Sequence, residues 1–132
     1  MSHGQPLPHD AAHLHVTGAA HYVDDLPCPA NCLHLAFGLS SIASGQITDL
    51  SLDHVRVHEG VIAVLTAEDL PFSNDVSPAA GDESLLSEGR VHYSGQPIFL
   101  VIATSHLSAR KAARLAKVTY IEHEAILSID QA

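Results

Sequence analysis

The chain is poor in aromatic and basic side chains. It has no tryptophan, three tyrosines and three phenylalanines, and its 6 Lys and Arg residues stand against 15 Asp and Glu, for a formal net charge of −9. Proteins that bind nucleic acid or anionic membranes present clustered cations to phosphates. The acidic balance therefore argues against both kinds of partner. The single basic cluster is best explained as a solvated helix face: Arg110, Lys111 and Arg114.

Long hydrophobic runs are missing as well. The strongest, Ile98–Ala103, is about a third of the ~18 residues that a membrane span needs. Residues 1–10 lack the basic patch and apolar stretch of a signal peptide. With 132 residues, of which 46% are hydrophobic, the chain suits one compact domain. We expect a cytoplasmic protein.

Cysteines are few, and their pattern is incomplete for a metal site. Cys28 and Cys32 occur as C-P-A-N-C, a spacing found within zinc sites, but no second cysteine pair follows. We therefore expect free, partly buried thiols rather than a metal or redox centre.

The motifs of common catalytic sites are absent. The sequence has no G-x-S-x-G nucleophile turn and neither of the glycine-rich phosphate loops. Pairs of carboxylates do occur, and all fall in expected turns or loops where they would be solvated: Asp24-Asp25, Glu68-Asp69 and Asp82-Glu83. We therefore assign no catalytic and no cofactor-binding residue to this chain.

Histidine is the one abundant metal ligand, with 11 residues. Four lie close together near the N-terminus: His9, His13, His15 and His21. Alternate residues of a strand point the same way, so His13 and His15 could chelate an ion from one face of a strand. Apart from Asp10, no acidic or cysteine ligand accompanies them at fixed spacing. We expect only adventitious Ni²⁺ or Zn²⁺ binding and assign no metal site.

The periodicity of the first half predicts short strands. Residues 1–12 are rich in Pro, Gly and His and predict an extended lead-in, followed by one domain over 13–132. Residues 20–23 predict a short strand. Strict alternation over 33–39 is typical of a half-buried strand. One of its faces carries Leu33, Leu35, Phe37 and Leu39, and the other carries His34, Ala36 and Gly38.

The middle of the chain predicts a strand, a capped turn and a loop. Alternation over 45–52 slips after Ile47, which indicates a bulge or a change into helix. Residues 61–66 form an apolar run typical of a buried strand, and Thr66 can cap a single turn after it. Residues 72–88 contain acidic but no basic side chains and predict a long mobile surface loop.

A Gly95-Gln96-Pro97 triplet precedes an apolar run that predicts a central strand. Pro97 suits the first position of a strand, and Gly95 permits a sharp entry. Gln96 can either meet unpaired backbone groups at the bend or face a neighbouring domain, and we favour the first.

The last third predicts one longer helix and a final strand. Alanines recur at helical spacing over 105–118, with Ser105 as N-cap, so this helix can lie very close to a sheet. Val118 and Tyr120 then alternate. The order of elements indicates an α+β fold: a mixed β-sheet with one longer Ala-rich helix and short helical turns.

Four segments in this order resemble one family, the a/b hammerhead domain of the molybdenum-binding subunit of xanthine dehydrogenases and aldehyde oxidases. "VTGAAHYVDDLP" is similar to the family's G-x-A-x-Y-x-D-D entry, and "HEGVIAVLTAEDLP" to its P-G-V-x-A-V-x-T-x-x-D-L-P, with Glu59 in place of the usual Pro. "VHYSGQPIFLVIATSHLSARKAARLAKVTY" is similar to its V-x-Y-x-G-Q-P-I strand and A-x-x-A-A helix. "LHLAFGLSSIASGQI" also matches, and the overlapping segment "CPANCLHLAFGLS" is most similar to bacterial xanthine dehydrogenase.

The resemblance implies a structural domain within a subunit of several hundred residues. The parent would be a molybdenum-dependent xanthine dehydrogenase that hydroxylates hypoxanthine and xanthine to urate, with water as oxygen donor and NAD as final electron acceptor. Its molybdopterin would be held by C-terminal domains of the same subunit, and its FAD and [2Fe–2S] clusters by a partner subunit. The fragment itself would be inactive. The alternatives are the same domain of an aldehyde oxidase, or a free-standing His-rich module that binds metal or a partner.

Overall fold

The structure is a computed structural model that describes residues 4, 6–79 and 81–131, and its contacts divide the chain into two units, Met1–Ala30 and Asn31–Ala132. The domain boundary predicted after residue 12 stays a prediction, because contact density alone does not define a domain. Within the described ranges, no helix has the length and apolarity that crossing a membrane requires.

The N-terminal unit contains two short helices. Helix α1 (Ala12–Thr17) ends at Gly18, whose φ is 73°, and the 3₁₀ turn η1 (Val23–Asp25) follows. The strand predicted over 20–23 is wrong, because Asp25 accepts a hydrogen bond from the Tyr22 N–H at 2.8 Å and so starts a helical turn. None of the described side chains up to residue 30 is buried, so this unit has no core of its own.

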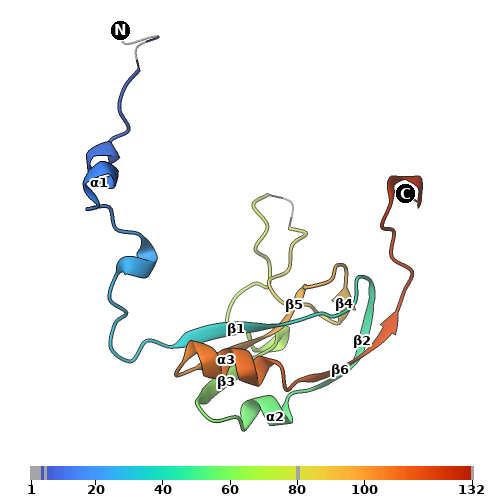
Figure 1. Cartoon of the computed structure of the whole chain (residues 1–132). Helices are drawn as coiled ribbons and strands as arrows, with labels where there is room; N and C mark the ends of the chain where they lie inside the picture. Colours follow the sequence, from blue (N-terminus) through green and yellow to red (C-terminus); the bar gives the residue numbers. More distant parts are fainter. Residues whose placement is uncertain (1–3, 5, 80, 132) are drawn as a thin grey trace. The chain divides into compact units, whose positions relative to one another are not determined.

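The larger unit has the predicted α+β composition, and Figure 1 shows its elements. Its helices and strands in chain order are β1 (His34–Leu39), β2 (Gly45–Ser51), α2 (Asp53–Arg56), β3 (Val61–Leu65), η2 (Ala67–Asp69), β4 (Arg90–Val91), β5 (Pro97–Ala103), α3 (His106–Ala113), β6 (Lys117–Glu122) and η3 (Ile129–Gln131). The strands expected over 33–39, 45–52 and 61–66 are therefore confirmed.

The strands form two antiparallel sheets where one mixed sheet was expected. The first has the order β1-β5-β3 and the second β4-β2-β6. Strand β5 lies at the centre of the first sheet, as its continuous apolar run predicted. The alternation slip in β2 is a bulge: Ile47 pairs with Tyr120 and Asp49 with Thr119, which leaves Thr48 without an opposite residue.

Strand β1 turns its small residues, not its large ones, toward the core. Ala36 is half-buried and Gly38 buried, whereas Leu35 and Phe37 are 55% and 44% exposed. The cause lies on β5, where Phe99 pairs with Gly38 and its ring fills the space that a β-carbon at Gly38 would need. A large side chain on that face of β1 has no room.

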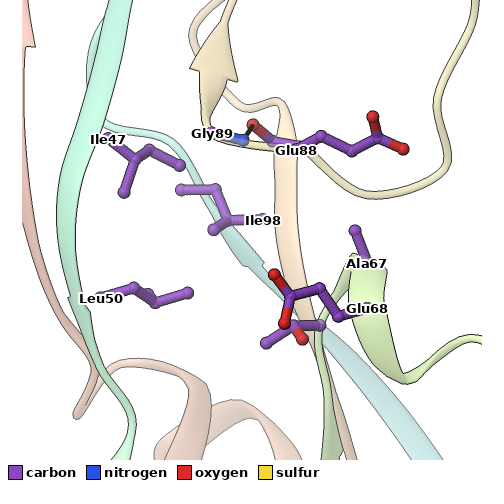
Figure 2. A pocket seen from close by; sticks show the side chains of 9 residues that line it. Ile47, Leu50, Ala67, Glu68, Glu88, Gly89 and Ile98 are labelled. Carbon is purple, nitrogen blue, oxygen red and sulfur yellow. Dashed lines mark hydrogen bonds between the residues drawn. The ribbon is translucent and has the colours of Figure 1, made fainter.

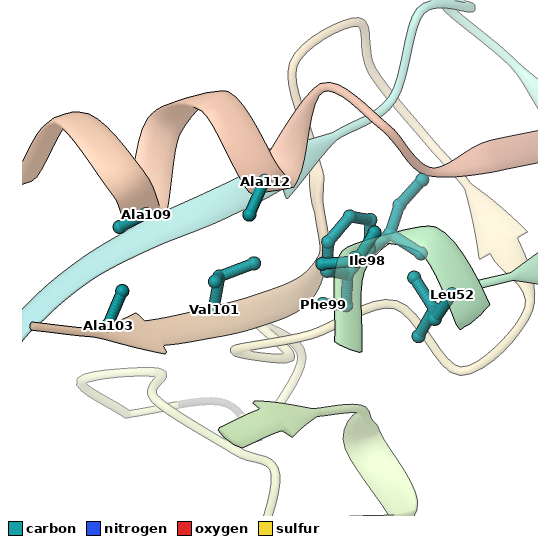
Figure 3. Close-up of a cluster of buried hydrophobic side chains, with 8 residues drawn as sticks. Leu52, Ile98, Phe99, Val101, Ala103, Ala109 and Ala112 are labelled. Atoms are coloured by element: carbon teal, nitrogen blue, oxygen red, sulfur yellow. The ribbon is translucent and has the colours of Figure 1, made fainter. Parts of the chain in front are cut away.

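Helix α3 covers the inner face of the β1–β5–β3 sheet at close range. Ala109 and Ala112 are completely buried and, in Figure 3, point from the helix toward Val101 and Ala103 of β5. Ser105 caps the helix, because its Oγ accepts a hydrogen bond from the Ser108 N–H at 3.1 Å. The predicted close packing of an alanine face is confirmed. The buried core comprises Leu52, Val55, Ile98, Phe99, Val101, Ala103, Ala109 and Ala112.

The acidic loop over 72–88 lies on the surface but is anchored at its base. Asn74 accepts a hydrogen bond from the Leu86 N–H at 2.9 Å and donates one to the Leu86 carbonyl at 2.7 Å. The Leu86 side chain is completely buried. The amide of Asn74 therefore adds to the backbone bridge between Asp75 and Ser84, and together they hold the two arms of the loop.

Candidate functional site

The Gly95-Gln96-Pro97 triplet forms the entrance to β5. Gly95 has a φ of 87°, a left-handed conformation that suits glycine. Gln96 is only 4% exposed, and its Oε1 accepts a hydrogen bond from the His92 N–H at 2.7 Å. Ser40 and the triplet exchange backbone hydrogen bonds across the sheet, at 2.9 Å each: Ser40 N–H to Gln96 O and Gly95 N–H to Ser40 O. The amide thus satisfies backbone at the bend, as the favoured interpretation predicted.

A cleft of about 580 Å³ lies between β2, η2 and the segment that leads into β4. In Figure 2, Ile47, Leu50 and Ile98 form an apolar floor, and Glu68 and Glu88 lie on the opposite side. Both carboxylates are exposed. Their charge disfavours an anionic ligand, and the buried hydroxyl of Ser87, which also lines the cleft, already donates a hydrogen bond to the Arg90 carbonyl at 2.7 Å.

A second cleft, of about 490 Å³, separates β1 from the end of α3 and from β6. Arg110 and Arg114 line it together with apolar side chains, and both arginines are exposed. This agrees with the predicted solvated face for the basic cluster. The lining contains no His, Cys, Asp or Glu side chain that could hold a metal.

The carboxylate pairs lie in turns and loops, as predicted. In η2, Asp69 accepts hydrogen bonds from the Thr66 N–H and hydroxyl, both at 2.8 Å, and these lower the pKa of Asp69 below its ordinary 3.8. In the acidic loop, the Ser77 hydroxyl and N–H likewise lower the pKa of Asp75. Both groups are stabilised in their charged form, which suits a helix cap and not a proton donor.

The histidine-rich segment does not form the strand on which chelation depended. His13 and His15 lie on helix α1, where side chains two positions apart point about 200° from each other. His15 has ring neighbours in His9 and Tyr22, with centroids 6.3 and 6.2 Å away. No group of three or more metal-binding side chains occurs among residues 4, 6–79 and 81–131. The assignment of no metal site stays a prediction.

The cysteines are exposed, so the expected partial burial is wrong. Cys28 belongs to the N-terminal unit and Cys32 to the larger one. The Cys32 Sγ lies 3.7 Å from the Leu33 carbonyl oxygen. Both cysteines lie in residues 26–33, the irregular segment between η1 and β1, and neither side chain enters the core.

A row of apolar side chains lies on the outer face of the β1–β5–β3 sheet, opposite α3. Residues directly opposite each other in a sheet point to the same side. The register places Leu35 beside Ile102 and Phe37 beside Leu100, and β3 adds two more apolar partners. We use the name outer face for these six residues: Leu35, Phe37, Ala63, Leu65, Leu100 and Ile102.

All six residues of the outer face are apolar and partly or largely accessible to solvent. None of them belongs to the buried core or packs against it. The sequence carried the signal for this surface, since β3 and β5 read as continuous apolar runs, which are typical of strands covered on both faces. In β1 the same signal was not recognised, because the alternation over 33–39 predicted a strand with only one buried face.

Comparison with known proteins identifies the fold. A family model described as "Aldehyde oxidase and xanthine dehydrogenase, a/b hammerhead domain" matches residues 17–124. The chain is 36% identical over 129 residues to a xanthine dehydrogenase of Oryza sativa, covering 98% of this chain and 9% of that one. It is 38% identical over 130 residues to nicotinate hydroxylase hnxS of Emericella nidulans, covering 98% of this chain and 10% of the relative.

A solved structure gives the same result. The aldehyde oxidoreductase of Desulfovibrio gigas superposes with a TM-score of 0.82 at 30% identity, over 95% of this chain and 15% of that one. The fold is thus that of one small domain of a large oxidoreductase. The chain belongs to the aldehyde oxidase and xanthine dehydrogenase family, as its a/b hammerhead domain, which confirms the resemblance found in the sequence. It spans about a tenth of the length of the curated relatives named above.

Proposed function

We propose that the chain is the N-terminal domain of the molybdenum-binding subunit of a xanthine dehydrogenase and that its own part is architectural. The whole enzyme would hydroxylate hypoxanthine and xanthine to urate, with water as oxygen donor and NAD as final electron acceptor. C-terminal domains of the same subunit would hold molybdopterin, and a partner subunit would hold FAD and [2Fe–2S] clusters. We place this enzyme in the cytoplasm of a bacterium.

One observation carries the proposal: a xanthine dehydrogenase aligns with 98% of this chain, while the chain accounts for only 9% of that relative. Most of that relative lies outside the aligned domain, and we assign the chemistry to those other parts. The chain is also 38% identical to a nicotinate hydroxylase, so similarity of this domain alone does not identify the substrate. The choice of purine therefore has to be measured on the whole enzyme.

The cleft between β2 and η2 does not fit molybdopterin. The larger cleft is flanked by Glu68 and Glu88, and their charge repels the phosphate of the pterin. The carboxylates with a lowered pKa, Asp69 and Asp75, are already used by local hydrogen bonds. We derive no catalytic step through these residues, and their engagement in caps and turns is consistent with an architectural part.

Substrate oxidation by the complete natural enzyme tests the proposal. The full subunit, purified with its partner and its cofactors, is expected to convert hypoxanthine and xanthine to urate with reduction of NAD. Aldehydes and nicotinate serve as competing substrates. Oxidation of an aldehyde or of nicotinate without any turnover of purine would overturn the assignment to xanthine dehydrogenase.

The architectural part has a separate test. The 132-residue chain alone, mixed with molybdopterin and a purine, is expected to show no turnover. Urate formation by this chain would contradict an architectural role.

A further inference from the structure

We propose that the outer face of the β1–β5–β3 sheet is the surface on which the remainder of the same polypeptide packs. The inference rests on the proposed function, in so far as it takes this domain to be part of a longer subunit. It names the contact surface, which the proposed function leaves open.

The first step is the chemical nature of the sheet. Strands that are covered on both sides carry apolar residues on both sides. Strands β1, β3 and β5 contain no Asp, Glu, Lys or Arg at any position. Their inner side is covered from within the domain by the core, in which α2 contributes Val55 and α3 contributes Ala109. The outer face has the same chemistry, but none of its six residues belongs to the buried core or packs against it.

The second step is the size of the exposed side chains. Leu35 and Phe37 are 55% and 44% exposed, and their neighbours before and after on the same side, Leu33 and Leu39, are 47% and 54% exposed. Scattered single apolar residues on a surface are ordinary. Here Leu33 directly precedes β1, the strand itself carries Leu35, Phe37 and Leu39, and the half-buried Leu100 and Ile102 continue the row on β5. Such a row is typical of a protein–protein contact.

The third step concerns the kind of occupant. All six basic residues of the chain lie outside the three strands. No residue of the outer face is itself a cation for a lipid headgroup or a nucleic-acid phosphate, and Arg110 and Arg114 meet it only at Phe37, in the second cleft. Its complement is an apolar protein surface.

The fourth step selects the protein. This fold occurs in the Desulfovibrio gigas enzyme as 15% of a longer chain, which leaves a large amount of covalently attached protein to cover the sheet. A second copy of this domain is disfavoured, because each copy carries a formal net charge of −9. An attached domain also binds at a high effective concentration, so a modest apolar surface suffices.

Thiol accessibility tests the proposal on the natural full-length polypeptide and on the 132-residue chain. Leu35→Cys places a thiol on the outer face. Leu107→Cys is the matched control, since Leu107 is 62% exposed on α3, on the other side of the sheet. Reaction with a maleimide is followed by mass spectrometry of the peptide that contains each new cysteine, so that Cys28 and Cys32 do not interfere.

We expect the Leu35→Cys thiol to react at least about tenfold more slowly in the full-length polypeptide than in the short chain, because a covered site reacts only when it opens. The Leu107→Cys rate should change by less than about twofold. Equal rates for Leu35→Cys in both proteins would overturn the proposal. Protection in the short chain that grows with its concentration would also overturn it, in favour of a second copy.

Purine turnover measured on the same preparation separates this inference from the proposed function. Protection of Leu35→Cys without purine oxidation would support the surface and refute the purine assignment. Purine oxidation without protection would refute the surface alone.

Discussion

Gly38 of β1 and Phe99 of β5 are paired residues of complementary size. The Phe99 ring occupies the position that a β-carbon on Gly38 would take, and Phe99 is 1% exposed. The absence of one side chain on β1 thus creates the seat for the largest side chain of the core.

Gly38→Ala should destabilise the domain, because the methyl group cannot enter without displacing the ring. We expect the free energy of unfolding to fall by about 1–3 kcal/mol, the usual cost of overpacking a core. Urea denaturation followed by circular dichroism measures it. Combining Gly38→Ala with Phe99→Leu should cost less than the sum of the two single changes. Strict additivity would show that the two residues do not compete for space.

Gln96→Ala should weaken the entrance to β5. Without Oε1, the His92 N–H loses its acceptor, and we expect a loss of about 1–2 kcal/mol in the free energy of unfolding. Gln46→Ala is the control, because Gln46 is exposed on β2, and it should change stability by less than about 0.5 kcal/mol. In the parent enzyme, turnover by Gln96→Ala should match the wild type under conditions where both are folded. Normal stability with lost turnover would reverse the assignment of Gln96.

Ala109→Leu should separate α3 from the sheet. Ala109 has no exposed surface, and a larger side chain there forces the helix outward at a cost of about 1–3 kcal/mol. Leu107→Ala, on the same helix but 62% exposed, should change stability by no more than about 0.5 kcal/mol. Comparable effects of both changes on the urea midpoint would mean that the helix is not held by its alanine face.

The pKa of Asp69 should depend on the hydrogen bonds that it accepts from Thr66 in η2. Its pKa lies below 3.8 in the folded chain, because the Thr66 N–H and hydroxyl stabilise the carboxylate. A lowered pKa contributes stability above pH 3.8 that is lost as pH falls through the folded value. Thr66→Ala removes the hydroxyl and should raise the pKa of Asp69, measured by carbon-13 NMR of its carboxyl group. The pKa of Asp75, which depends on Ser77, should not change. An unchanged pKa of Asp69 would mean that the Thr66 backbone N–H alone stabilises its carboxylate.

The order of elements in the larger unit follows from the sequence because strands and helix differ in period. The apolar run before Ala103, the slip after Ile47 and the alanine spacing over 105–118 each specify one local geometry. The N-terminal strand failed because Asp25 closes a turn through its own side chain, a local bond that outweighs a four-residue pattern.

Which side of β1 faces inward could not be derived from its pattern. Apart from His34, both sides of this strand are apolar, so alternation defines two faces without ranking them. The side of β1 that faces inward is determined by Phe99, more than fifty residues away in sequence, and by the close approach of α3. The outer face was missed for the same reason, since a surface completed by other domains looks like core when only the sequence is considered.

Strand β1 borders its sheet, and in the described part of the chain it is paired on one edge only. It combines that open edge with six residues that include no charge and no proline, which is the composition of segments that stack into cross-β fibrils. The formal net charge of −9 opposes such stacking between copies, so the domain produced alone should stay dispersed and thioflavin-negative at the low concentrations of thiol labelling. Within a complete enzyme, the neighbours that shield this strand would act as its protection against amyloid.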